Sequence, residues 1–310
     1  MELIRGLYNL RPSHQGCVAT IGNFDGVHLG HQAIIGQLAE KSAELGLPST
    51  IITFEPHPQE YFAKTSAPPR LTRLREKILV LRRFTLDRVL YLRFNEKLTQ
   101  MTAQDFIQTL LIDGLGVRCL VVGDDFRFGY RREGNLKMLQ AAGENAGFQV
   151  INMHTFNVEN ERVSSTRIRK ALLEADLPLA ATLLGRAYRM AGRIVHGQKR
   201  GRILGFPTAN IYLHRIQTPL TGVFTVEVFG LAKEPLKGIA NIGARPTVNG
   251  QSCLLEVHLL DFDEDIYGHH VQVEFITKLR DEIKFESLDA LKAQIQQDEQ
   301  QARHFFSTLP

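Results

Sequence analysis

Apolar and polar positions alternate in two different ways along the first half of the chain. Strand-like runs (CVATIG at 17–22, STIITF, VLYLRF) alternate with segments at helical spacing (HQAIIGQLAEKSAELG at 31–46, REKILVLRRF, TAQDFIQTLLIDGLG). The later runs CLVVG and FQVINM are apolar on both faces, which is typical of parallel strands covered by helices. The pattern predicts a Rossmann-like open α/β sheet over about residues 17–156, with ligands at the carboxyl ends of its strands.

The pattern changes near Gly185. Short strand candidates (YRMAGRIVHG, GVFTVEVFG, GIANIG, CLLEVHLLDF and VQVEFITKL) follow one another across glycine and proline turns, with no helix until about Ser287. They predict an antiparallel sheet or a small barrel. A last helix places apolar residues near one face and is expected to pack on the barrel: Leu288, Leu291, Ile295, Ala302 and Phe305. We expect a linker at about 177–189, with domains at 1–185 and 186–310.

Composition agrees with two domains and narrows the class of protein. The chain has 310 residues, 44% of them hydrophobic, which is too long for one compact core. No run approaches the roughly 18 apolar residues of a membrane span, and the start lacks the apolar segment of a secretion signal. We therefore expect a cytoplasmic protein with no membrane partner. Three widely spaced cysteines, Cys17, Cys119 and Cys253, indicate buried thiols rather than disulfides or a metal knuckle.

The net charge of +4 is compatible with polyanionic ligands, but it is too small to indicate a nucleic-acid-binding arm. The arginines gather near glycine or serine at 127–132, 162–169 and 193–202, where phosphate-binding loops are expected. The alternative for each cluster is a solvated surface.

The stretch GNFDGVHLGH (22–31) ends the first predicted strand and enters the first predicted helix. Free backbone N–H groups and the positive end of the helix dipole favour an anion there, so His28 and His31 are candidate phosphate ligands. Zinc binding is the main alternative, although no further ligand stands at a usual spacing. A purely structural histidine pair is the other.

The later stretch VSSTRIRK (163–170) places hydroxyl groups and arginines at a predicted helix start, which also suits phosphates. Alone, it is adequately explained as an N-cap. Together with GNFDGVHLGH on a parallel sheet, it resembles the nucleotidyltransferase superfamily, in which an HxGH motif and a downstream serine/threonine/arginine motif hold ATP from two sides.

TFEPHP (53–58) and GDDFRFGYRREGN (123–135) extend the likeness to the FMN adenylyltransferase module of prokaryotic bifunctional FAD synthetases. The resemblance implies that His28 and His31 act in catalysis and gives His57 a weaker role in ordering its loop. It assigns ATP to one set of residues and the flavin to another: Asn23, Asp25, Ser165, Thr166 and Arg169 for ATP; Asp125, Phe126, Phe128 and Gly129 for the flavin.

GRIVHGQKRGRILGFPTAN (192–210) is rich in glycine and basic residues, but it is not a Walker loop, and no GxxxxGK[ST] occurs in the chain. Out of context, a solvated hairpin tip would explain it. GFPTAN, NIGARPTV, LEVHLLDFDEDIYG and LRDEIKF follow the order found in riboflavin kinases, and this resemblance spans 186–295. It implies a six-stranded antiparallel barrel that binds ATP and Mg²⁺: Gly197, Lys199, Arg200, Gly201, Gly205 and Pro207 for ATP; Thr208 and Asn210 for the metal.

In this family the nucleophile is the riboflavin hydroxyl, which needs a base, and Glu256 in LEVH matches that base. Leu255 and Val257 should point to the opposite face from Glu256, which suggests an inward glutamate at the barrel mouth. An exposed strand glutamate is the alternative. We also place Arg280 and Glu282 at the flavin end.

The sequence as a whole predicts a bifunctional enzyme that phosphorylates riboflavin to FMN and adenylates FMN to FAD, with ATP as co-substrate and Mg²⁺ at both sites. The alternatives are another HxGH adenylyltransferase, which leaves the second half unexplained, and a non-catalytic flavin- or RNA-binding regulator. Neither membrane nor nucleic-acid partners are expected, and self-association is left open.

Overall fold

The computed structural model describes residues 1–63, 66–196, 205–247 and 250–308. Its chain divides into two compact units. The first comprises Met1–Pro68 and Thr72–Ser164, and the second comprises Pro69–Leu71 and Ser165–Pro310. The boundary expected after residue 185 stays a prediction.

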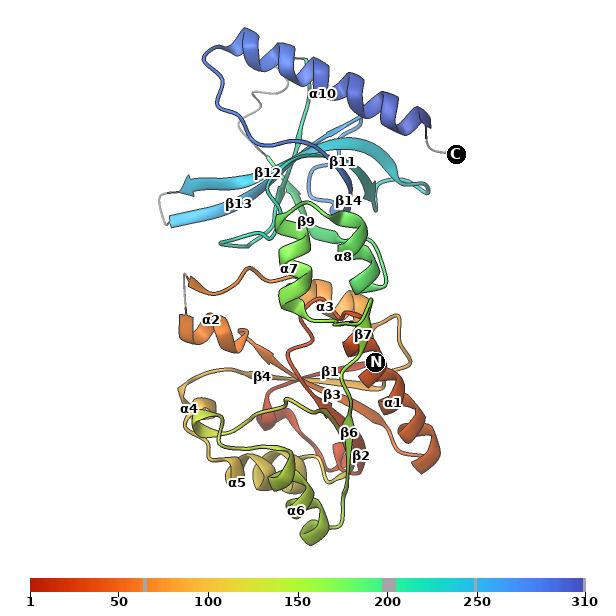
Figure 1. Cartoon of the computed structure of the whole chain (residues 1–310), viewed down its shortest axis with the longest axis vertical. Coiled ribbons are helices and arrows are strands. Elements are labelled where there is room, and N and C mark those ends of the chain that lie inside the picture. The colour runs from red at the N-terminus through yellow and green to blue at the C-terminus, as the bar shows by residue number, and fades with distance from the viewer. Residues whose placement is uncertain (64–65, 197–204, 248–249, 309–310) are drawn as a thin grey trace. The chain divides into compact units, whose positions relative to one another are not determined.

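The first unit is built on a six-stranded sheet with the order β1-β4-β3-β2-β5-β6 (Figure 1). All neighbouring strands are parallel, which confirms the predicted open α/β fold. The strands are β1 (Glu2–Arg5), β2 (Cys17–Ile21), β3 (Ser49–Glu55), β4 (Arg88–Arg93), β5 (Val117–Gly123) and β6 (Gln149–Met153). β1 was not predicted, because four residues are too few to show a period.

Helices cover both faces of this sheet, so alternate residues of one strand enter different cores. Val18 of β2 packs with Ile35 and Leu38 of α1, whereas Ala19 belongs to the core formed with Leu110 and Leu139. The helices are α1 (Leu29–Leu45), α2 (Pro58–Ala63), α3 (Leu74–Leu81), α4 (Glu96–Thr99), α5 (Ala103–Phe106), the π-helix η4 (Ile107–Gly114) and α6 (Leu136–Ala146). Short elements complete the unit: η1 (Leu7–Asn9), η2 (Pro12–His14), η5 (Tyr130–Arg132), β7 (Asn157–Val158) and β8 (Glu161–Arg162).

One predicted helix differs from the structure. The segment 102–116 was expected to be a single α-helix, but it continues from α5 into η4. There the Leu115 N–H donates to the Leu110 carbonyl, five residues back. The hydrophobic pattern cannot distinguish an α-helix from a π-helix here. Leu110 and Leu111 are buried in η4, and apolar residues at these positions also fit the buried face of an α-helix.

The second unit contains a closed barrel with the order β10-β13-β12-β11-β14-β9, in which all pairs are antiparallel, as predicted. Its strands are β9 (Arg189–Val195), β10 (Ala209–Tyr212), β11 (Gly222–Phe229), β12 (Leu236–Thr247), β13 (Gly250–Leu259) and β14 (His270–Arg280). Fully buried residues in register fill the barrel, among them Ile211, Leu255 and Ile242.

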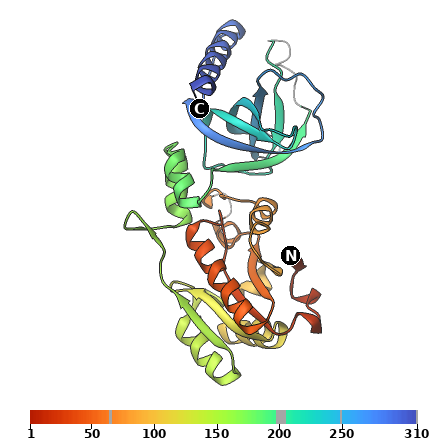
Figure 2. The ribbon, with the colours of Figure 1, turned by 90° about the vertical axis from the view of Figure 1, so that its right-hand side faces the viewer.

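Among the described residues of this unit, the helices are α7 (Ser165–Leu173), α8 (Leu177–Leu184) and α10 (Leu288–Thr308). Ala302 and Phe306 of α10 pack on Val223 and Ile239, so the last helix lies along the barrel wall as predicted (Figure 2). Helix α8 occupies part of the expected linker. The Asp176 carboxylate caps its start.

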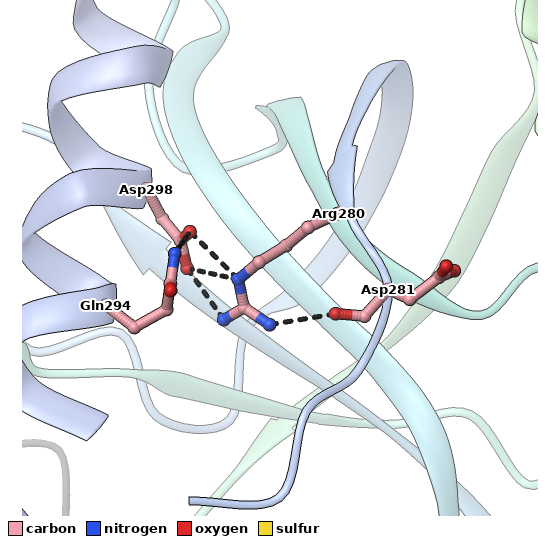
Figure 3. A network of polar contacts seen from close by, with 4 residues as sticks. All are labelled: Arg280, Asp281, Gln294 and Asp298. Atoms are coloured by element: carbon pink, nitrogen blue, oxygen red, sulfur yellow. Dashed lines mark hydrogen bonds and ion pairs between the residues drawn. The ribbon is translucent and has the colours of Figure 1, made fainter. Parts of the chain in front are cut away.

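Arg280 ties α10 to the end of β14 (Figure 3). Its guanidinium donates to both carboxylate oxygens of Asp298, with Nε to Oδ1 at 2.9 Å and a terminal nitrogen to Oδ2 at 2.7 Å. The Asp298 side chain is 4% exposed, and Gln294 also donates to it. The expected place of Arg280 at the flavin end stays a prediction.

The short stretch Pro69–Leu71 belongs to the second unit through its backbone. Its carbonyl groups accept hydrogen bonds from three side chains: Arg169 to Pro69 at 2.7 Å, Arg215 to Arg70 at 2.5 Å and Tyr188 to Leu71 at 3.0 Å. This unit is therefore assembled from two separate parts of the chain.

Candidate active sites

The loop that carries the two histidines leaves β2 and enters α1 through a compact turn. Phe24 and Val27 adopt positive φ angles of 48° and 44°, and Gly26 adopts 85°. His28 is the N-cap of α1, where its Nδ1 accepts from the His31 backbone N–H at 3.3 Å. The turn thus places His28 and His31 together at a helix start, where an anion is favoured.

The two imidazole rings stack with their centroids 3.6 Å apart and their planes 18° from parallel. Gly30 permits this arrangement, because a Cβ there would lie 3.3 Å from two atoms of the His28 ring. Burial is the main cause that holds the pKa of His31 well below its usual value of 6.5. The charges of His28 and Lys77 add to it. His31 is therefore neutral at pH 7.

Thr72 and Lys77, which the sequence analysis did not identify, hold this loop through hydrogen bonds. The Asp25 carboxylate accepts from the Thr72 backbone N–H at 2.9 Å, and the Thr72 hydroxyl accepts from the Gly26 N–H at 2.9 Å. Lys77, only 3% exposed, donates to the Asn23 carbonyl at 2.6 Å and to the Thr53 hydroxyl at 3.3 Å. Sequence alone gave no signal for Lys77, because its polar character resembles that of an exposed helix position.

The second phosphate motif lies in α7. Ser165 and Thr166 form its first turn, and Arg169 follows one turn later with its Nε bonded to the Pro69 carbonyl. Since α7 belongs to the second unit and the histidines to the first, the joint ATP site remains a prediction.

The predicted flavin loop follows β5. Asp125 forms an exposed ion pair with Arg162 at 2.5 Å. Phe126 stacks on Phe128 at 5.5 Å, but Phe128 is 6% exposed and lies in the core, so Phe126 is the more accessible ring. Gly129 has a φ of 73°, and a Cβ there would lie 2.6 Å from the Ala103 nitrogen. His57 is buried, and its Nδ1 accepts from the Gln59 N–H at 3.2 Å, as expected for a residue that orders its loop.

In the barrel, two of the predicted kinase residues face each other. Asn210 of β10 stands directly opposite Glu256 of β13, and Asn241 of β12 stands opposite Glu256 on its other side. Directly opposed residues of antiparallel strands point to the same face, with Cβ atoms about 5 Å apart. The register therefore brings the predicted base beside a predicted metal ligand.

The expected inward orientation of Glu256 is wrong. Leu255 and Val257 are 0% and 1% exposed and line the barrel interior, so Glu256 lies on the outer face, where it is half-buried. The strand alternation was read correctly, but the sequence did not show which face was interior.

The PTAN segment leads into β10 and is held by β13. His258 Nδ1 lies 2.9 Å from the Pro207 carbonyl, and Phe206 packs edge-on against the same imidazole. Gly205 has a φ of 89°. The Asn210 amide nitrogen lies 3.5 Å from the Thr208 carbonyl. The remaining predicted ATP residues of this site, Gly197, Lys199, Arg200 and Gly201, lie outside the described residues.

Within the described part of the chain, no three histidine, cysteine or acidic side chains form a group that could hold a metal. All three cysteines are buried and free, and burial raises the pKa of Cys17 to about 11. No helix among the described residues is long and apolar enough to cross a bilayer.

Known protein families match both halves of the chain. The FAD synthetase family model matches residues 10–167, and the riboflavin kinase family model matches residues 184–306. The bifunctional riboflavin kinase/FMN adenylyltransferase of Haemophilus influenzae is 50% identical over 308 residues, covering 99% of this chain and 100% of its own. The chain belongs to the bifunctional riboflavin kinase/FMN adenylyltransferase family. The family predicted from the motifs is thereby confirmed.

Other relatives agree along nearly the whole chain. The Escherichia coli (strain K12) enzyme of the same description is 52% identical over 307 residues, covering 99% of this chain and 98% of its own. A crystal structure from Streptococcus pneumoniae, described as a macrolide-efflux protein, matches with a TM-score of 0.81 and 30% identity, covering 98% of this chain and 99% of its own. The two-unit fold is therefore shared over its full length.

Proposed function

We propose that this chain converts riboflavin and ATP to FMN and ADP in the barrel, and FMN and ATP to FAD and pyrophosphate in the α/β unit. Membership of the bifunctional family supports both reactions and their assignment to the two halves. The observation that carries the residue assignment is the pairing of Asn210 with Glu256 in one unit and of His28 with His31 in the other.

The kinase reaction needs a base, because the 5′-hydroxyl of riboflavin is a poor nucleophile until its proton is removed. Glu256 takes that proton while the hydroxyl oxygen bonds to the γ-phosphorus of ATP, and the bond from the γ-phosphorus to the ADP oxygen breaks. ADP leaves with the bonding electron pair. Glu256 is half-buried on the outer face of the barrel, on the same side as Asn210.

Thr208 and Asn210 would hold Mg²⁺ beside this base. A hydroxyl and an amide oxygen are hard ligands of the kind that Mg²⁺ binds, usually in small number and together with substrate phosphates. Asn210 uses its amide nitrogen toward the Thr208 carbonyl, which leaves its oxygen as the metal-binding atom. When bound, the ion would neutralise charge on the ATP phosphates.

The adenylyltransferase reaction needs no strong base, because the FMN phosphate is already an anion. A phosphate oxygen attacks the α-phosphorus of ATP, and the bond from the α-phosphorus to pyrophosphate breaks. His28 and His31 donate hydrogen bonds to the oxygens on which charge develops. Because His28 Nδ1 accepts from the His31 backbone, the neutral His28 ring carries its proton on Nε2 and donates from there.

These assignments are tested by a chromatographic time course with riboflavin, ATP and Mg²⁺, resolving riboflavin, FMN and FAD. FMN should rise before FAD. H28A and H31A should abolish FAD formation and leave FMN formation intact, whereas E256Q should abolish FMN formation and still convert supplied FMN to FAD. Each variant thus has an internal control in the other activity. Wild-type protein that converts neither substrate would overturn the function, and variants that retain both activities would overturn the residue roles.

A further inference from the structure

Lys77 is a buried cation behind the histidine loop, and none of the sequence motifs includes it. It projects from α3, is 3% exposed, and its Nζ donates to the Asn23 carbonyl at 2.6 Å. A charged group is seldom buried unless the structure uses it, since removal of its water is costly. The burial of Lys77 therefore needs an explanation other than contact with solvent.

The contacts of Lys77 join three elements at the carboxyl end of the sheet. Thr53 of β3 lies within 3.3 Å of Nζ and donates its own hydroxyl to the same Asn23 carbonyl. Asn23 belongs to the loop whose last residue, His28, caps α1. Fixing this carbonyl restrains the start of the loop that carries both histidines.

The charge of Lys77 also acts on His31. Among the described residues, the charged or titratable groups that lower the pKa of His31 are His28, on the same helix start, and Lys77, on α3. His31 is kept neutral, so it offers a hydrogen-bond donor without a charge.

We propose that Lys77 is a positioning residue of the adenylyltransferase site, which fixes the histidine loop through the Asn23 carbonyl and places a positive charge beside His31. This inference rests on the proposed adenylyltransferase function. It explains why a cation is buried behind His31 at a site that must bind two anionic substrates.

The decisive test is the pH dependence of FAD formation in K77M, measured with supplied FMN, ATP and Mg²⁺ from pH 6 to pH 8.5. At pH 8, K77M should lower kcat by about 10²-fold, the order of loss expected when catalytic groups are displaced by about 1 Å, with KM values changed less than about threefold. Without Lys77, His31 becomes protonated at a higher pH than in the wild type. The deficit should therefore shrink as the pH falls toward 6.

Two further measurements separate charge from shape. K77Q keeps an N–H donor for the Asn23 carbonyl without the charge, so it should recover part of kcat at pH 8 and still show the deficit shrinking as the pH falls. The His31 ring signal in NMR, assigned by its loss in H31Q, should titrate at a higher pH in K77M than in the wild type. T53V removes only the neutral partner and should leave this titration unchanged.

Riboflavin kinase activity of the same variants serves as the control for intact protein. A wild-type/K77M ratio of kcat that is constant across pH, or an unshifted His31 titration, would overturn the role of the charge even if activity falls. A wild type that makes no FAD would instead refute the proposed function, so the two failures are distinguishable.

Discussion

Replacing Asp298 with asparagine should destabilise the second unit strongly, although the side chain hardly changes in size. Asp298 is 4% exposed and receives three N–H contacts of 2.7 to 3.1 Å from Arg280, whose side chain is 18% exposed. D298N replaces one acceptor oxygen with an NH₂ group that faces another donor and leaves the guanidinium without a counter-ion. Breaking a buried ion pair from one side costs 3–5 kcal/mol.

We expect the lower end of that range, about 3 kcal/mol, because the guanidinium keeps some contact with water. For a unit of this size, the loss corresponds to a drop in Tm of about 6–12 °C. The protein contains no tryptophan, so thermal unfolding is best followed by circular dichroism, with riboflavin kinase activity reporting on the second unit.

Glu299, the next residue on α10, provides the matched control. It pairs with Arg303 one turn away at 2.8 Å, where the Glu299 and Arg303 side chains are 22% and 44% exposed, and Arg303 has Asp261 as a second partner. E299Q should therefore cost less than about 0.5 kcal/mol. Equal and small losses for D298N and E299Q would refute the argument that burial makes the Arg280 pair important. A larger loss in D298N with unchanged FAD formation from FMN would confine the effect to the second unit, as expected.

Two shorter predictions concern the first unit. G30A would place a methyl group 3.3 Å from the His28 ring and should lower the rate of FAD formation at least tenfold, measured against unchanged FMN formation; full activity would show that the ring stacking is dispensable. The backbone hydrogen bond from Ser49 is the main cause that lowers the pKa of Asp87 in the folded protein. The ionised Asp87 therefore stabilises the fold above the ordinary pKa of 3.8, and this stabilisation is lost as the pH falls through the lower pKa of the folded state. Because Asp87 is exposed and solvent screens its charge, D87N should reduce stability at pH 7 by less than about 1 kcal/mol and have little effect near pH 2, as checked by urea unfolding at both pH values.

Most of the fold could be predicted from the sequence, because hydrophobic period and turn residues act locally. The strands that the spacing of hydrophobic residues did not predict show the limit of this reasoning. β1 and β10 have four residues each, and β10 was anticipated only through the resemblance to riboflavin kinases. Such short strands are defined by the neighbours with which they pair rather than by their own pattern.

In the candidate sites, residues close together in sequence could be predicted, whereas residues that only the fold brings together could not. His28 and His31 could be recognised because the loop and the helix start are contiguous in sequence. Lys77 could not, since its partner Asn23 lies 54 positions earlier. The orientation of Glu256 was misjudged because period two separates two faces without saying which one faces the interior of a closed barrel.

The hydrogen bonds to Pro69–Leu71 have a consequence for how this protein can diverge. Their acceptors are main-chain carbonyls, which every amino acid supplies, so substitutions within the stretch leave all three bonds available to Arg169, Arg215 and Tyr188. Insertion or deletion of a single residue would instead move every carbonyl out of register. These hydrogen bonds are thus insensitive to substitution but sensitive to a change in length, whereas at Leu71 the fully buried side chain restricts the choice of residue.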